Sequence, residues 1–508
     1  MTKCDQGHIK RSAHSATLDR MNRSAHSHFN PWLALVVVCL GQFMVVLDAT
    51  IVNVALPSIK ADLHISAANL QWIVNAYTLL FGGFLLLGGR AADLFGRRTV
   101  FMTGIAIFTL ASVAAALSTD PTQLIVARAI QGLGAALLSP AALAVITTTF
   151  AEGAERTKAL SIWAAIASGG SAVGLLLGGI LTETLSWEWI FFINVPIGVA
   201  ILFAAFRLVP NSRVEGGSRH FDIVGAVSVT AGLLVLVYAI VKAQEWGWGS
   251  GSTLGLTALA VALLGAFIAI EARSPFPLVR LSLFKMRSLA VANGVFLMVI
   301  GGMFAMFFFA SLYLQNILGY SALTTGLAFL PVTVGIMMGA VTAQQLVPKV
   351  GVRRVMITGL GVAALGLAIL GSATQVDGTY LGVLGGLFPM SLGMGATFVS
   401  LTLVATTNVD HDDAGLASGI FNTSQQVGGA LGLAILSTLA NDRTTSVLGD
   451  VFGRPTQGQI DSALVDGYQL AFFVAAGLLA LGAVLLGVLL RQRDVARIDA
   501  GDAVPVPA

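Results

Sequence analysis

The chain has 508 residues, of which 56% are hydrophobic and 10% are charged, and its formal net charge is +3. A typical soluble domain carries roughly 25% charged residues, so this composition argues against a soluble enzyme and indicates a polytopic membrane protein. The basic residues are scattered without a dense cluster, which argues against a nucleic-acid partner. The two cysteines, Cys4 and Cys39, lie in a polar and an apolar segment, so no disulfide framework is expected.

Residues 1–30 are polar and carry basic side chains, and they lack the short apolar core of a removable signal peptide. We expect a disordered cytoplasmic tail. Four histidines fall within it: His8, His14, His26 and His28. Because no second ligand cluster follows at a fixed spacing, a solvated tail is favoured over a metal site, and no metal or other cofactor is expected.

Fourteen apolar segments follow, each near the roughly 20 residues that a helix needs to cross a hydrocarbon core of about 30 Å. They cover residues 31–56, 69–89, 99–118, 122–146, 159–182, 189–209, 222–243, 252–271, 288–316, 323–347, 352–372, 379–407, 414–438 and 468–490. Most lysines and arginines fall on the even-numbered connections and the two tails, as expected for the cytoplasmic side. The sequence therefore predicts an all-α, multi-pass protein of the cell membrane, with both termini cytoplasmic.

An internal repeat divides these spans. Residues 88–98 read GGRAADLFGRR after the second span, and residues 343–354 read AQQLVPKVGVRR after the tenth. Two related halves of six spans, with a site at their interface, are a known transporter plan. We predict an N-terminal half over 31–210, a linker with two inserted helices over 211–279, a C-terminal half over 280–490 and a cytoplasmic tail over 491–508.

The first span ends in LDATIVNVALP, residues 47–57, which contains the carboxylate of Asp48. The sequence from Pro31 to Leu56 holds no other charged residue. An ionisable group within a span usually faces a bundle interior or a water-filled cavity and marks a substrate, ion or proton path. We therefore expect Asp48 to lie on such a path.

The fourth span carries Arg128, with Gln131 one turn further along the same helical face. At 1.5 Å per residue, Arg128 lies about 10 Å from the outer end of its span and Asp48 about 13 Å from the outer end of its own, so their depths are similar. A structural ion pair is one interpretation of this match. An arginine that governs proton binding at Asp48 is the other, and the two are compatible.

Residues 89–98 form a short polar connection between two spans. Gly89 and Gly96 allow a tight turn and close helix approach. Asp93, Arg97 and Arg98 are candidates for ionic latches at a cytoplasmic gate. An ordinary basic loop is the alternative, but the spacing of Gly, Asp and Gly favours the gate.

The fifth span repeats glycine every four residues at Gly170, Gly174 and Gly178, with Gly179 beside the last. Such a stripe lets another helix pack closely or slide, and ordinary small-residue packing is the alternative. Several polar side chains elsewhere are candidates to line a cavity, although each is equally suited to bond a neighbouring backbone. They are Asn53, Gln71, Tyr313, Gln315, Asn316, Asn422 and Gln425.

Together these motifs resemble the fourteen-helix drug:proton antiporters of the major facilitator superfamily. The resemblance covers nearly the whole chain and rests on LDATIVNVALP, the G-x3-D-x2-G-R-R connection, R-x2-Q-G-x-G in the fourth span, the glycine stripe, and SWEWIFFINVPIG at residues 186–198. It implies a rocker-switch exporter. In that scheme Asp48, Arg128 and the fifth span serve coupling, and Asp93 with Arg97 serves the gate.

Two positions depart from the family pattern. Leu175 stands where the family usually has a proline after the second glycine of the stripe, which removes the basis for a proline-dependent bend. Pro348 takes the position of Asp93 in the second copy of the repeat, so only the first half is expected to carry a full latch.

The sequence thus predicts an antiporter that exports amphipathic drugs or antibiotics, driven by protons and acting as a monomer in a bacterial membrane. A dedicated exporter of a self-made metabolite is the alternative that the same scaffold would serve. A membrane sensor or scaffold is disfavoured because the longest outer connection, 439–467, is too short for a soluble module. A membrane enzyme is disfavoured because no span holds a histidine or paired acids.

Overall fold

A computed structural model describes residues 30–150, 153–210, 212, 222–275, 277–406, 414–451, 454–492 and 495. In this part of the chain every regular element is a helix. The two predicted tails, 1–30 and 491–508, lie almost entirely outside the described residues, so the expected disorder of the first and the cytoplasmic position of both stay predictions.

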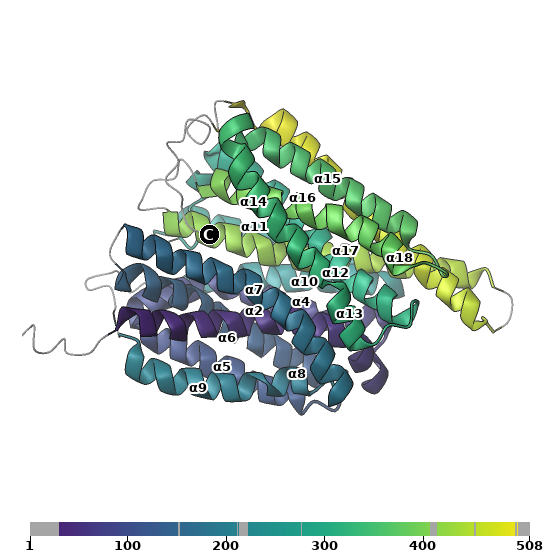
Figure 1. The fold of residues 1–508 in the computed structure, drawn as a ribbon, viewed down its shortest axis with the longest axis horizontal. Coiled ribbons are helices and arrows are strands. Elements are labelled where there is room, and N and C mark those ends of the chain that lie inside the picture. Colours follow the sequence, from purple (N-terminus) through teal and green to yellow (C-terminus); the bar gives the residue numbers. More distant parts are fainter. Residues whose placement is uncertain are drawn as a thin grey trace, which may run out of the picture.

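The described helices follow the chain in two groups separated by a helical hairpin (Figure 1). The first group is α2 (Pro31–Asp62), α3 (Ala67–Leu70), α4 (Trp72–Phe95), α5 (Arg97–Ala116), α6 (Pro121–Thr149), α7 (Ala154–Thr184), α8 (Trp189–Phe192) and α9 (Asn194–Leu208). The hairpin is α10 (Ile223–Trp246) and α11 (Gly251–Arg273). The second group is the 3-10 helix η1 (Leu281–Lys285), α12 (Arg287–Asn316), α13 (Ala322–Ala328), α14 (Leu330–Val350), α15 (Val352–Ala373), α16 (Tyr380–Thr406), α17 (Ala414–Gly449) and α18 (Gln457–Leu489).

These helices agree with the predicted spans. Among the described residues, 12 helical segments are long and apolar enough to cross a membrane, with α8–α9 and α13–α14 each acting as one segment. Helices α7 and α17 cover the two remaining predicted spans, 159–182 and 414–438. The all-helical membrane fold predicted from composition and periodicity is therefore confirmed.

Local chemistry explains where several helices begin. Pro31 and Pro121 each occupy the first helical turn, where the missing proline N–H costs no hydrogen bond. The preceding residues cap these helices: Asn30 accepts a bond from the backbone of Trp32, and Asp120 accepts bonds from the two residues after Pro121.

The predicted outer connection 439–467 is instead mostly helical. Helix α17 continues to Gly449, and α18 begins at Gln457 behind a capping box formed by Thr456 and Gln459. Figure 1 shows this pair reaching beyond the neighbouring helices. The Thr444 hydroxyl donates to the carbonyl oxygen of Ala463 at 3.1 Å, which joins the two extensions. The apolar pattern missed them because they are polar helices held by each other rather than by lipid.

The two groups of helices contact each other along α4 and α17 and are also joined at one end of the bundle. We call it the outer end, because it holds the turns 63–66, 117–120 and 185–188 that are predicted to face outside. There the Ser311 hydroxyl donates to the carbonyl oxygen of Asn53 at 2.9 Å, and the Gln315 amide donates to that of Val54 at 2.9 Å. The boundaries of the predicted domains stay a prediction, but these bonds tie α2 to α12.

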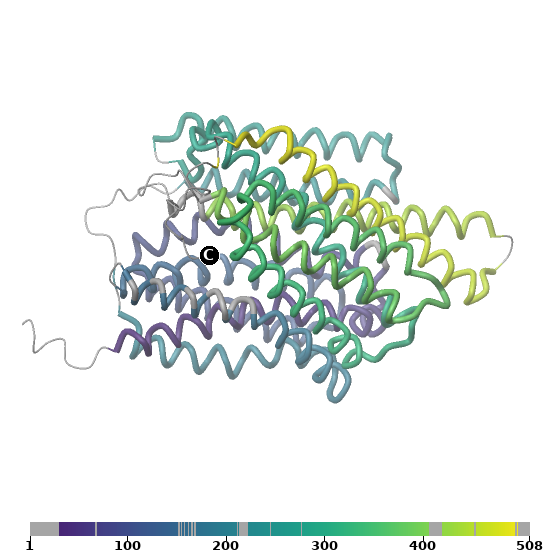
Figure 2. Tube along the Cα trace, turned by 45° about the horizontal axis from the view of Figure 1, so that its top comes forward, coloured from purple at the N-terminus to yellow at the C-terminus, as the bar shows by residue number. Residues whose placement is uncertain are grey.

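A second pair of helices also meets at the outer end. A Cβ on Gly326 of α13 would lie 2.5 Å from the carbonyl oxygen of Leu175, and one on Gly179 of α7 would lie 2.6 Å from the Cα of Leu323. Only glycine allows this approach. The Glu183 carboxylate accepts the backbone N–H of Leu323 at 3.0 Å. From this contact α7 and α14 diverge toward the other end (Figures 1 and 2).

The internal repeat is visible in the backbone. Gly96 and Gly351, at matching positions of the two motifs, have φ values of 101° and 87° and each joins two helices directly. The matching arginines also act alike. Arg98 donates to the carbonyl oxygen of Phe206 at 3.3 Å, at the end of α9, and Arg353 donates to that of Gly487, at the end of α18.

The inserted hairpin lies against the seam between the two groups. A small cluster joins it there to α4 and α17, with Leu79, Leu233, Val237, Ala430 and Ala434 buried together. Helix α11 packs on α10 and exposes apolar side chains on its other side: Leu254, Leu259, Val261 and Ile268. The structure thus places α11 at the lipid-facing edge.

This arrangement predicts how single cysteines in the hairpin react. In native membranes, a lipid-soluble maleimide is expected to label Val261→Cys rapidly, because Val261 is 62% exposed on the apolar side of α11. Val237→Cys is the matched control and should react slowly, because Val237 is fully buried on α10. Equal labelling rates, or substrate protection at Val261→Cys, would contradict the peripheral position.

Candidate functional site

The candidate site is a buried polar network around Asp48, which has no exposed surface. Helix α2 carries Asp48, and α6 and α9 supply its partners. Arg128 donates from Nη1 to Asp48 Oδ2, Gln131 donates from Nε2 to Oδ1 at 2.7 Å, and Asn194 donates from Nδ2 to Oδ1 at 3.1 Å. The structure therefore brings together the predicted residues Asp48, Arg128 and Gln131.

Arg128 is also held by groups other than Asp48. Its Nε donates to the carbonyl oxygen of Ile73 at 3.1 Å, and its Nη1 donates to Gln131 Oε1 at 2.7 Å. Its guanidinium carbon lies 4.3 Å from the ring centroid of Tyr77 and 5.7 Å from that of Phe191, distances at which an aromatic face stabilises a cation. The arginine therefore keeps several partners if Asp48 loses its charge.

Ser112 of α5 completes the network. Its hydroxyl donates to the carbonyl oxygen of Phe108 at 2.8 Å and accepts from the Gln131 amide at 2.8 Å. The Asn194 amide lies 3.4 Å from the same hydroxyl. Ser112 thus orients the two amides that donate to the carboxylate.

The sequence analysis missed Asn194, Ser112 and Tyr77 as members of this network. Only Asn194 carried a usable signal, since it is the one amide in the apolar run from Trp189 to Phe206. A buried amide in such a run requires a polar partner. Ser112 and Tyr77 look like ordinary helix residues, and nothing in their spacing indicates that they turn toward Asp48.

The glycine stripe of α7 packs on the segment of α2 that holds Asp48. A Cβ on Gly174 would overlap the Thr50 hydroxyl, and one on Gly178 would lie 2.8 Å from the carbonyl oxygen of Ile51. Gly170 faces Val46 in the same way, at 3.2 Å. The three glycines therefore follow α2 along both sides of Asp48, while Gly179 contacts α13.

Leu175, the departure from the family pattern, is 2% exposed and lies within the same helix, which has no proline inside it. It belongs to an apolar cluster that also includes residues of α2 and α12, such as Ile51 and Phe296. The leucine therefore contributes apolar packing at the junction of the two groups, where proline would remove a backbone donor.

The predicted gate motif forms only part of the expected latch. Asp93 and Arg97 pair at 3.1 Å across the turn between α4 and α5, and the Arg97 backbone N–H donates to the carbonyl oxygen of Ser212 at 2.9 Å. Arg98 instead donates to carbonyl groups at the end of α9 in this structure, and its part in a cytoplasmic gate stays a prediction. Gly89 faces Pro140, with 3.6 Å left for a Cβ, and Gly96 supplies the positive φ of the turn.

The predicted cavity-lining residues separate into three kinds of environment. Asn53 and Gln315 lie at the contact between α2 and α12, as described above. Gln71 and Tyr313 are both buried in this structure: Gln71 accepts from Asn75, and Tyr313 bonds the backbone of Gln375, so their place in a cavity stays a prediction. The remaining three have exposed or half-buried side chains: Asn316, Asn422 and Gln425.

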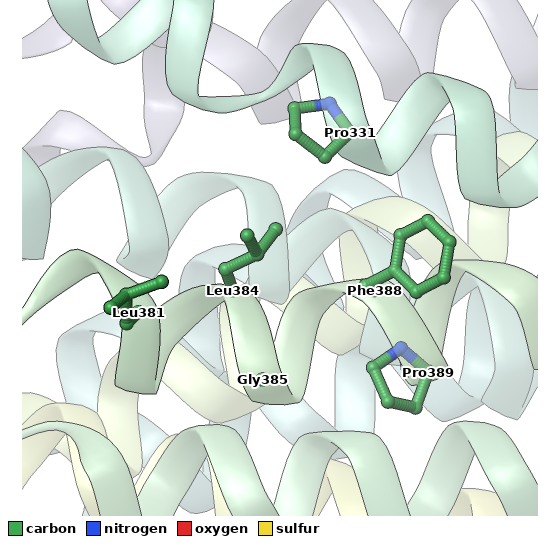
Figure 3. A pocket seen from close by; sticks show the side chains of 6 residues that line it. All are labelled: Pro331, Leu381, Leu384, Gly385, Phe388 and Pro389. Carbon is green, nitrogen blue, oxygen red and sulfur yellow. The ribbon is translucent and has the colours of Figure 1, made fainter.

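A shallow groove between α14 and α16 lies apart from this network (Figure 3). Its lining is entirely apolar and consists of Pro331, Leu381, Leu384, Gly385, Phe388 and Pro389. Leu381 is 78% exposed, so the groove faces away from the bundle. No charged or polar side chain there offers a means of coupling, and we do not assign it to the site.

Comparison with known proteins places this geometry in a family. The profile of the Major Facilitator Superfamily matches residues 38–433, and the chain belongs to that superfamily of transporters. It is therefore a multi-pass membrane transporter and not an enzyme.

Several similar proteins are named as exporters or resistance proteins. The chain is 42% identical to the puromycin resistance protein of Streptomyces alboniger, over 94% of this chain and 95% of that one. It is 42% identical to a cephamycin export protein of Amycolatopsis lactamdurans, over 81% and 85%. It is 35% identical to a multidrug resistance protein of Mycobacterium tuberculosis (strain CDC 1551 / Oshkosh), over 80% and 75%.

Solved structures show the same fold at low identity. A crystal structure of an auto-inhibited peptide transporter of the POT family superposes with a TM-score of 0.66 at 15% identity, covering 91% of this chain and 96% of that one. A bacterial homologue of the human lysosomal transporter Spinster superposes with a TM-score of 0.63 at 15% identity, covering 92% of this chain and 98% of that one.

The packing of α7 on α2 leads to a mutational test. Gly178→Ala should destabilise the protein by about 1–3 kcal/mol and reduce transport, because its Cβ meets backbone atoms of Ile51 that have little room to move. Gly169→Ala is the matched control on the same helix, since no atom lies within 4 Å of its Cβ. Thermal unfolding and transport at equal expression provide the readout. If both variants behave alike, the stripe is not the contact that positions α2.

Proposed function

We propose that this transporter is a proton-coupled exporter of amphipathic drugs or antibiotics, in which Asp48 binds and releases the coupled proton. The observation that carries the proposal is the buried network. It places one carboxylate in the N-terminal group beside an arginine that has four other partners, Ile73, Gln131, Tyr77 and Phe191. A buried ionisable group of this kind is typical of a proton path.

The proposal extends to direction and orientation. With both termini in the cytoplasm, as the basic residues predict, the outer end faces the exterior. In this structure the contacts between α2 and α12 and between α7 and α13 close that end. Alternating access would require these bonds to break for release outside, and the gradient of protons would supply the energy without a cofactor. A single chain holds all parts of this scheme, which favours a functional monomer.

The relatives support a small-molecule substrate, and two substrate ranges are consistent with them. One is the broad class of amphipathic drugs, which the multidrug resistance relative favours. The other is a single self-made metabolite, which is favoured by relatives named as export proteins for cephamycin and tetracenomycin C. Expression in an efflux-deficient bacterial host, scored for resistance to chemically diverse compounds, separates them: broad resistance supports the first and resistance to one chemical class the second.

The proposed role of Asp48 is tested in inverted membrane vesicles with an imposed pH gradient. Wild type should accumulate a monovalent amphipathic dye, and Asp48→Asn should lose gradient-driven accumulation while inserting normally. A divalent analogue should be carried much less well, because the network offers one carboxylate and no second negative charge. Gradient-driven transport that survives in Asp48→Asn, or equal transport of the divalent analogue, would place the coupling acid elsewhere.

A further inference from the structure

The partners of Asp48 suit its ionised carboxylate, but in this arrangement they offer no acceptor for the O–H of the protonated acid. Each of its contacts donates a hydrogen bond: one from Arg128 and one each from the amides of Gln131 and Asn194. A protonated carboxyl group carries an O–H that needs an acceptor. If a buried site provides no acceptor for this O–H, protonation of Asp48 is disfavoured.

Most oxygen atoms near Asp48 are already engaged. Gln131 Oε1 accepts from Arg128 at 2.7 Å, and the Ser112 hydroxyl donates its hydrogen to Phe108 while it accepts from Gln131. Among the residues that bond the Asp48 carboxylate, Asn194 is the exception: its Oδ1 is buried and has no hydrogen-bond partner. Asn194 itself has no exposed surface, so water does not substitute for the missing donor.

An amide side chain presents an acceptor and a donor of nearly equal shape, and a half-turn of the group exchanges them. We propose that Asn194 is a positioning residue that switches between these two roles: its NH₂ donates to the Asp48 carboxylate, and its oxygen accepts the O–H of the protonated acid. The proton binds at Asp48 Oδ1 and leaves from the same atom, so Asn194 neither gains nor loses one. The charge of the Asp48–Arg128 pair changes from zero to plus one.

The surroundings of Asn194 suit such a movement. It is the first residue of α9, and the helical run is interrupted at Ile193, between α8 and α9. Pro196 follows two residues later and has no backbone N–H to extend the helical bonding across this point. Arg128 retains its bonds to Ile73 and Gln131 and its aromatic contacts throughout, so the amide is the part of the network that changes partners.

A second group near Arg128 is also a candidate acceptor for the O–H of protonated Asp48. The hydroxyl of Tyr77 is also buried without a partner, and the ring of Tyr77 faces Arg128. If that hydroxyl accepted the proton of Asp48, Tyr77→Phe would carry the effect predicted below for Asn194. The two substitutions therefore serve as competing arms of one experiment.

The inference rests on the proposed proton coupling and is tested by the pH dependence of dye efflux in vesicles containing the full-length protein. Asn194→Leu keeps the size of the side chain but removes both its donor and its acceptor. The carboxylate keeps two donors, Arg128 and Gln131, whereas the protonated acid loses the acceptor proposed here, so the loss of the acceptor should dominate. Protonation should then require about a tenfold higher proton concentration, which moves the pH of half-maximal efflux down by about one unit. Asn194→Ser offers both an acceptor and a donor and should move this midpoint back toward that of wild type.

Thr109→Val is the matched control, because Thr109 is a buried polar residue that packs on α9 at Gly198 and makes no hydrogen bond to Asp48. It and Tyr77→Phe should leave the midpoint unchanged, whatever they do to the maximal rate. A lower rate without a shifted midpoint in Asn194→Leu, or a shift in Tyr77→Phe instead, would overturn the role of Asn194. A wild type without any proton dependence would instead overturn the proposed function and this inference with it.

Discussion

A charge pair removed from both water and lipid is the constraint on which the rest of this structure depends. Separated from its partner, either Asp48 or Arg128 would be strongly unfavourable in the interior of a membrane bundle. The two residues differ in the other partners that stabilise them. Arg128 has a backbone carbonyl, a side-chain amide and two aromatic rings in addition to Asp48, whereas Asp48 has only donors that suit its ionised form. Because arginine keeps its proton in proteins, Asp48 is the one of the two whose charge changes in the proposed cycle.

The helices that carry this pair are connected to the part of the protein that must move. The glycine stripe of α7 holds α2 on both sides of Asp48, and the same helix reaches α13 through Gly179 and Leu175. In the proposed cycle, a change in the packing of α2 would therefore reach the contact between the two groups of helices. The close packing of the stripe is present here with leucine at the position where the family usually has proline.

The sequence was sufficient for the fold and for the centre of the site because both follow from strong physical rules. Apolar length located the helices, and the shared depth of two isolated charges located the pair of Asp48 and Arg128. The remaining network was not predictable, because Ser112 and Asn194 come from other helices whose rotation a single sequence does not define. The same limit explains Tyr313, which lies on a polar-looking position but turns inward to bond the backbone of Gln375. The helical extensions of α17 and α18 were missed because their pattern is polar.

The central claim is that Asp48 gains and loses a proton while it remains buried beside Arg128. Infrared difference spectroscopy of the purified, membrane-reconstituted protein between acidic and neutral pH measures this directly, because a protonated carboxyl group has a carbonyl band that the carboxylate lacks. We predict a titrating band in wild type that is missing in Asp48→Asn, with Asp93→Asn as the control that retains it. Identical difference spectra for wild type and Asp48→Asn would show that Asp48 stays ionised, and would contradict the account.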